Sequence, residues 1–204
     1  MQIFQIIWTA LTTENELLTK IIFIPEIFIE TTIDMLLFTT LLDISSNKNI
    51  KLRYVLLVSI LGNISNIFIP NPYKSFINLF VIFMSIILLF KTNILKSLFA
   101  TILPLFITVL CESLFMKVCI SYFSFDTTSI IAIPLYKLSI SLFIQLLVFL
   151  TYKAIKYLKL QVSIVEDMSN KSKTILLINF LFAILAIVVQ FFITGFYLNK
   201  LPIY

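Results

Sequence analysis

The last apolar run of the chain, residues 174–197, contains twenty-four consecutive residues without a charged side chain. The hydrocarbon core of a bilayer is roughly 30 Å thick, and about 20 helical residues are enough to cross it. Similar runs recur along the chain, with most charges in the short gaps between them. This is why 60% of the residues are hydrophobic and the mean hydropathy is +1.09. The sequence therefore predicts a protein that crosses a membrane several times.

The predicted fold is all-α, a polytopic membrane helix bundle, because the strands of a membrane β-barrel would alternate apolar and polar residues over about 10 positions. Residues 1–20 lack the charged start and the cleavage site of a signal peptide, so they are expected to stay in the mature protein. They are expected to form an N-terminal interfacial segment. Residues 21–204 are expected to form one membrane domain of about six transmembrane helices. The predicted spans are 21–42, 54–70, 76–90, 97–120, 131–152 and 174–197.

Lysine and arginine residues predict the orientation of the chain. Ten of them lie in the loops after the first, third and fifth spans, and three lie in the segments on the opposite side. Because positively charged loops stay in the cytoplasm, the chain is predicted to be N-out and C-out. The longest basic loop, 153–173, is interpreted as a topology determinant near anionic lipid, and no nucleic-acid partner is expected. The chain is expected to be part of a longer polypeptide, in which a seventh span returns it to the cytoplasm.

Some kinds of chemistry are excluded by composition. The chain has no histidine and only two glycines, which excludes Ser-His and Cys-His catalysis, most zinc sites and the usual glycine-rich phosphate loop. Cys111 and Cys119 are eight residues apart, or about 12 Å along a helix, which is too far for a disulfide. No catalytic residue, metal site or cofactor is predicted from these residues.

Ionisable side chains inside the predicted spans are the candidate site. Each costs roughly 2.5 to 3.5 kcal/mol at the centre of a membrane helix on insertion scales, so each needs a protein or water environment. Three carboxylates of the first span are four residues apart and share one stripe of a helix. The others lie in the outer halves of the fourth and fifth spans. The six candidates are Glu26, Glu30, Asp34, Glu112, Lys117 and Lys137.

Three interpretations of these charges are open. They form ion pairs that fix helix packing, or they line a ligand pocket open to the exterior, or the carboxylate stripe carries protons or cations. In the pocket interpretation, Asp34 is the floor and the other five residues form the walls. A direct pair between Glu112 and Lys137 is the expected contact.

Two stretches carry a resemblance to a known family. They are ILLFKTNILKSLFATILPLFITVLCESLF, with Glu112 embedded in a span, and the ending FYLNKLPIY. The chain resembles the N-terminal multi-span sensor region of clostridial, accessory-gene-regulator type sensor histidine kinases, whose kinase belongs to the GHKL ATPase class. The resemblance implies a receptor in the bacterial cytoplasmic membrane for an extracellular, often peptide, quorum signal. It also implies autophosphorylation of a histidine in a following helix, which this chain does not contain.

The first functional expectation is therefore the membrane sensor domain of a two-component receptor. Its expected partners are the lipid bilayer and an extracellular peptide or small hydrophobic ligand, and a homodimer is left open. Histidine kinase activity is implied only for a longer protein. The alternative is a small transporter or a substrate-binding membrane subunit, for which six spans suffice.

Overall fold

The computed structural model describes residues 2–13, 16–70, 73–123 and 133–160. All regular secondary structure in these residues is helical, which confirms the all-α prediction for them. The predicted span 174–197 lies outside the described residues. The helices are α1 (Gln2–Thr12), α2 (Glu16–Leu41), α3 (Lys48–Phe68), α4 (Tyr73–Phe90), α5 (Ile94–Phe123) and α7 (Pro134–Tyr157).

Four of the described helices are long and apolar enough to cross a membrane: α3, α4, α5 over Ile94–Val118, and α7. This indicates a multi-pass membrane protein. The remaining long helix, α2, has 26 residues and spans about 39 Å. It differs from the other four by carrying the three carboxylates Glu26, Glu30 and Asp34 within three turns.

Several helices extend beyond the predicted spans into segments expected to be loops. Helix α3 begins at Lys48, because the Asn47 side chain caps it by accepting a hydrogen bond from the Ile50 N–H at 2.9 Å. Asn93 does the same before α5, where it accepts from the Lys96 N–H at 2.7 Å. Such caps satisfy backbone donors that the helix itself leaves unpaired. The segment 1–20 contains α1 and also the first residues of α2.

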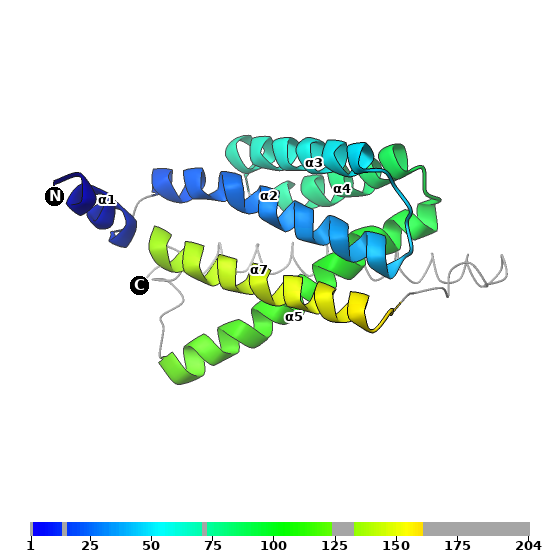
Figure 1. Ribbon diagram of the computed structural model, residues 1–204. Helices are drawn as coiled ribbons and strands as arrows, with labels where there is room; N and C mark the ends of the chain where they lie inside the picture. The colour runs from blue at the N-terminus through cyan, green and yellow to red at the C-terminus, as the bar shows by residue number, and fades with distance from the viewer. Residues whose placement is uncertain (1, 14–15, 71–72, 124–132, 161–204) are drawn as a thin grey trace, which may run out of the picture.

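Successive helices run in alternating directions, with α2, α4 and α7 one way and α3 and α5 the other (Figure 1). Helix α2 is central and contacts α3, α5 and α7, while α1 contacts α7. The C-terminal ends of α2, α4 and α7 meet the N-terminal ends of α3 and α5 at one end of the bundle, here called the basic end (Figure 1). Its positive side chains are Lys48, Lys51, Arg53, Lys91, Lys96, Lys153, Lys156 and Lys159.

The buried stripe of α3 has two larger residues near the basic end and small residues farther along the helix. It contains Tyr54, Val58, Ser59, Gly62 and Ser65, and a Cβ atom placed on Gly62 would lie 3.4 Å from Ile27 Cγ2 of α2. Small residues let membrane helices approach closely. The opposite face carries exposed Leu and Ile side chains, including Leu52 at 59% and Ile67 at 59% exposure. This distribution suits a helix whose outer face contacts lipid.

A cluster of three aromatic rings packs in the core near the basic end. The rings of Phe38, Tyr54 and Phe90, from α2, α3 and α4, meet edge to face with centroids 5.3 to 5.5 Å apart. Phe38 and Tyr54 are each 1% exposed. Edge-to-face contacts of this kind add stability beyond the buried area alone. The aromatic cluster therefore joins α2, α3 and α4 near the basic end. Glu26 and Glu30 lie farther from that end of α2 than Phe38 does.

Candidate functional site

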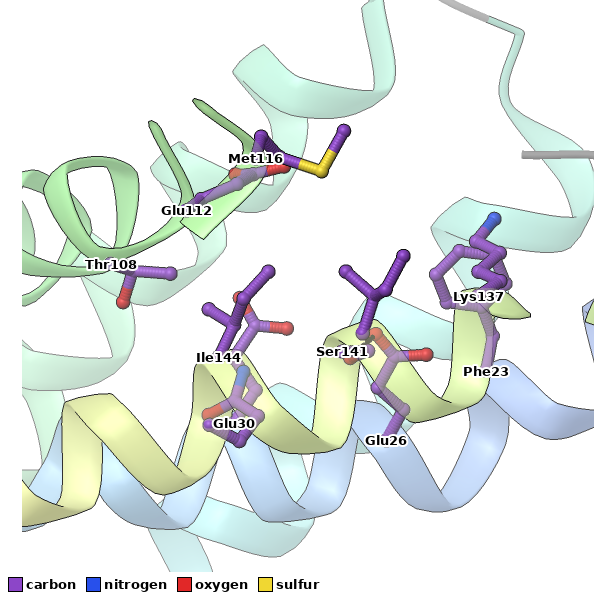
Figure 2. A pocket seen from close by; sticks show the side chains of 11 residues that line it. Phe23, Glu26, Glu30, Thr108, Glu112, Met116, Lys137, Ser141 and Ile144 are labelled. Atoms are coloured by element: carbon purple, nitrogen blue, oxygen red, sulfur yellow. Dashed lines mark hydrogen bonds between the residues drawn. The ribbon is translucent and has the colours of Figure 1, made fainter. Parts of the chain in front are cut away.

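A cavity of about 340 Å³ lies between α2, α5 and α7 (Figure 2). Most of its lining residues lie toward the N-terminal ends of α2 and α7 and the C-terminal end of α5, away from the basic end. Four of the six predicted site residues line the cavity, and the other lining residues are apolar or uncharged. The lining residues are Phe23, Glu26, Glu30, Thr108, Glu112, Met116, Lys137, Ile140, Ser141, Ile144 and Gln145.

Each helix contributes one face to the cavity. On α5 the lining residues Thr108, Glu112 and Met116 are four residues apart, and on α7 Lys137 and Ser141 have the same spacing. Residues at this spacing lie above one another on a helix. Figure 2 shows the α5 side chains on one side of the cavity and those of α2 and α7 on the other.

Glu26 has two carboxylate oxygens in different environments. The Ser141 hydroxyl of α7 donates a hydrogen bond to Oε1, and Figure 2 shows the two side chains together. Oε2 is buried and has no hydrogen-bond partner among the described residues. A buried polar atom without a partner is unfavourable by roughly 1–3 kcal/mol, and by more for a charged group.

One uncharged polar side chain of the cavity is also without a partner in the described part of the chain. Thr108 Oγ1 is buried and makes no hydrogen bond there. Gln145 lines the cavity as well and is only 6% exposed. Most buried polar groups in proteins are hydrogen-bonded, so the exceptions at Glu26 Oε2 and Thr108 Oγ1 mark this cavity as unusual.

The Lys137 ammonium does not form the expected pair with Glu112. Its Nζ lies 3.8 Å from the centre of the Phe23 ring on α2, and the charged groups that act on it electrostatically are Glu26 and Lys74. Among the described side chains, no ion pair joins Lys137 to Glu112. The reason is positional, because Glu112 stands on α5 across the cavity while α2 packs directly beside α7 (Figure 2).

Asp34 and Lys117 line no part of the cavity, so Asp34 is not its floor. Asp34 follows Glu30 by one helical turn toward the basic end and lies within electrostatic range of Glu30 and Tyr54. Its Oδ1 is buried without a partner among the described residues. Lys117 is exposed, because it is rotated by about 100° from Met116 on the same helix.

Sequence reasoning missed several lining residues, among them Phe23, Thr108, Met116 and Ser141. The sequence does indicate these positions, because each lies three or four residues from a charged residue of the predicted site on the same helix. Phe23 precedes Glu26 by three residues, Thr108 and Met116 flank Glu112 by four, and Ser141 follows Lys137 by four. Extending each charged position along its helix face would have found them.

Within the described residues, no group of three or more carboxylate or cysteine side chains is placed to hold a metal ion. Comparison with protein-family models, with curated proteins and with solved structures found no match. The chain's own residues are therefore the basis for a functional proposal.

Proposed function

We propose that this chain is the membrane domain of a bacterial signal receptor, which binds an extracellular ligand between α2, α5 and α7 and relays binding to a cytoplasmic histidine kinase. The observation that carries the proposal is the cavity of about 340 Å³, in which two buried polar atoms have no hydrogen-bond partner among the described residues. Ligand sites are typically cavities of about 300–1,000 Å³ with apolar walls and a few polar groups. A ligand that supplies the missing hydrogen bonds gains affinity from them.

A relay follows from the way the cavity is built. Its walls come from three helices, so a ligand that contacts Glu112 on α5 and Lys137 on α7 together favours one spacing of these helices. Binding changes the bundle only if the ligand prefers one of two arrangements. Helix α7 continues from Gln145 in the cavity to Tyr157 at the basic end, a distance of about 18 Å. A shift of α7 at the cavity therefore reaches the predicted cytoplasmic side.

The experiment uses the full chain in lipid nanodiscs and fractions of extracellular medium from the source organism. We expect one fraction to raise the melting temperature of the parent protein, and Glu112→Gln to reduce that shift at equal protein concentration. Lys117→Gln is the matched control, because Lys117 is a charged α5 residue outside the cavity, and it should respond like the parent. A parent that responds to no fraction, or a Glu112→Gln variant that responds normally, contradicts the proposal.

A small transporter remains the second candidate, and one observation favours it. The stripe of Glu26, Glu30 and Asp34 leads from the cavity toward the basic end, and Asp34 Oδ1 is buried without a partner in the described part of the chain. Intramembrane carboxylates of this kind occur in proton and ion pathways. Proteoliposomes loaded with a pH-sensitive dye distinguish the two candidates. Proton entry that is lost in Asp34→Asn supports a transporter, and an impermeable parent supports the receptor.

A further inference from the structure

The contact between Lys137 and Phe23 shows what kind of group the cavity accepts. The ammonium lies 3.8 Å from the ring centre, well within the roughly 6 Å range of a cation–π interaction. Lys137 is a half-buried residue on the cavity wall. An ammonium group is thus already held on an aromatic ring inside the cavity, at the end of a flexible four-carbon stem.

The charges of the cavity favour a further cation. Three carboxylates, those of Glu26, Glu30 and Glu112, line it together with the single ammonium of Lys137. Lys74, the other cation in range of Lys137, is not a lining residue. Charges interact more strongly in an apolar environment than in water, so an excess of carboxylates attracts a positively charged ligand.

The uncharged groups fit the same ligand. Gln145, which is 6% exposed, has a carboxamide oxygen that can accept a hydrogen bond, and so can the buried Thr108 hydroxyl. Glu26 Oε2 is a further acceptor, and like Thr108 Oγ1 it has no partner among the described residues. An ammonium group has three donors and no acceptor, and therefore complements these atoms. Apolar walls from Ile140 and Ile144 offer a surface for a carbon chain.

We propose that the cavity takes a ligand with a primary ammonium group on an apolar chain, and that Lys137 occupies the ammonium position on Phe23 until the ligand displaces it. This inference rests on the proposed ligand-binding function and names the chemical class of the ligand. Lys137 then acts as an internal competitor. Its displacement couples occupancy of the cavity to the N-terminal part of α7.

The test uses hexylammonium chloride as the probe, with 1-hexanol and hexanoate as neutral and anionic controls of similar size. Binding to the full chain in phosphatidylcholine nanodiscs is measured by calorimetry, with empty nanodiscs subtracted. We expect Lys137→Met to bind hexylammonium about ten-fold more tightly than the parent, because the internal competitor is gone. Adding Phe23→Leu should remove most of that gain. Lys117→Met, outside the cavity, should match the parent.

Helix content and elution volume show whether each variant is folded, and Lys137→Gln replaces Lys137→Met if the latter is not. Equal hexylammonium affinity in the parent and the lysine variant overturns the proposal. So does an equal gain for 1-hexanol, which would show that only space had been created. Binding of hexanoate that depends on Lys137 overturns the ammonium class and leaves the receptor proposal intact. The receptor proposal itself is tested separately, by the change in melting temperature with fractions of extracellular medium.

Discussion

Ser141 supplies the only described hydrogen bond to Glu26, because its hydroxyl donates to Oε1 while Oε2 has no described partner. Hydrogen bonds to charged groups contribute about 1.5–3 kcal/mol, so Ser141→Ala should lower the free energy of unfolding by about that amount. Ser139→Ala is the matched control on α7. Among the described residues, its exposed hydroxyl donates only to the Leu135 carbonyl, at 2.8 Å. Ser139→Ala should therefore lower the free energy of unfolding by less than about 0.5 kcal/mol. Unfolding in dodecyl sulfate measures both, and equal losses contradict a role for Ser141.

Lys137 should be coupled energetically to the charged residue that lies near it in the structure, and not to the one that lies across the cavity. Glu26 is in electrostatic range of Lys137, whereas Glu112 lies across the cavity on α5 (Figure 2). Neighbouring residues couple by about 0.5–3 kcal/mol, and independent ones add within about 0.5 kcal/mol. Double-mutant cycles of unfolding should therefore show coupling for Glu26→Gln with Lys137→Met and near additivity for Glu112→Gln with Lys137→Met. Stronger coupling of Lys137 to Glu112 than to Glu26 would contradict this expectation and support the pair predicted from the sequence.

The sequence predicted four cavity residues because a charge within an apolar run is visible without a structure. Glu26, Glu30, Glu112 and Lys137 are all of this kind. Phe23 carries no charge and is one of many aromatic residues in the spans, so only its position three residues before Glu26 on the same helix distinguishes it. The wrong expectation for the Glu112 and Lys137 contact has a similar cause. Residue spacing gives the face of each helix but not which helices are neighbours.

At the scale of elements, the contact between α2 and α3 depends on the small residues in the buried stripe of α3. Gly62→Ala should be tolerated, because its Cβ would lie 3.4 Å from Ile27 Cγ2 and alanine is favoured over glycine in a helix by about 1 kcal/mol. Gly62→Leu should lower the free energy of unfolding by about 1–3 kcal/mol, since it overfills the contact. Thermal unfolding in detergent compares the two variants with the parent. Equal stability of Ala and Leu would show that the contact is not tight.

Helix boundaries were less predictable than helix positions. The prediction ended spans where charges begin, so it placed Lys48 and Lys51 in a loop, although both belong to α3. Charged side chains do not prevent a helix when a cap such as Asn47 satisfies its first backbone donors. A membrane helix can therefore extend beyond the hydrocarbon core into the interface. Hydropathy measures the apolar core of a span, whereas hydrogen bonding sets its ends.

In the whole molecule, the basic end and the cavity lie in opposite halves of the helix bundle. The alternating helices bring the lysine-rich helix ends together at the basic end (Figure 1). Most of the residues that line the cavity lie in the opposite half of the bundle. The sequence could predict this separation from the alternation of charged loops. It could not predict the cavity volume, which depends on how α5 and α7 pack on α2.

The orientation of the bundle decides whether the cavity can receive an extracellular ligand. If the basic end is cytoplasmic, as the distribution of lysines and arginines predicts, the cavity half faces the outside. Single cysteines in a chain without Cys111 and Cys119 test this in intact cells, using the exposed positions Asn49→Cys at the basic end and Ser75→Cys at the other end. An impermeant thiol reagent should label the cysteine at position 75 directly and the one at position 49 only after permeabilisation.

The reverse labelling pattern would place the cavity half toward the cytoplasm and remove the route for an extracellular signal, whatever the cavity binds. Labelling of both positions in intact cells would contradict the alternating crossing of the membrane itself. Equal labelling of both after permeabilisation is the control for thiol reactivity, because it shows that position 49 is protected by the membrane and not by packing. Orientation is thus the measurement on which an extracellular sensor depends before any ligand is known.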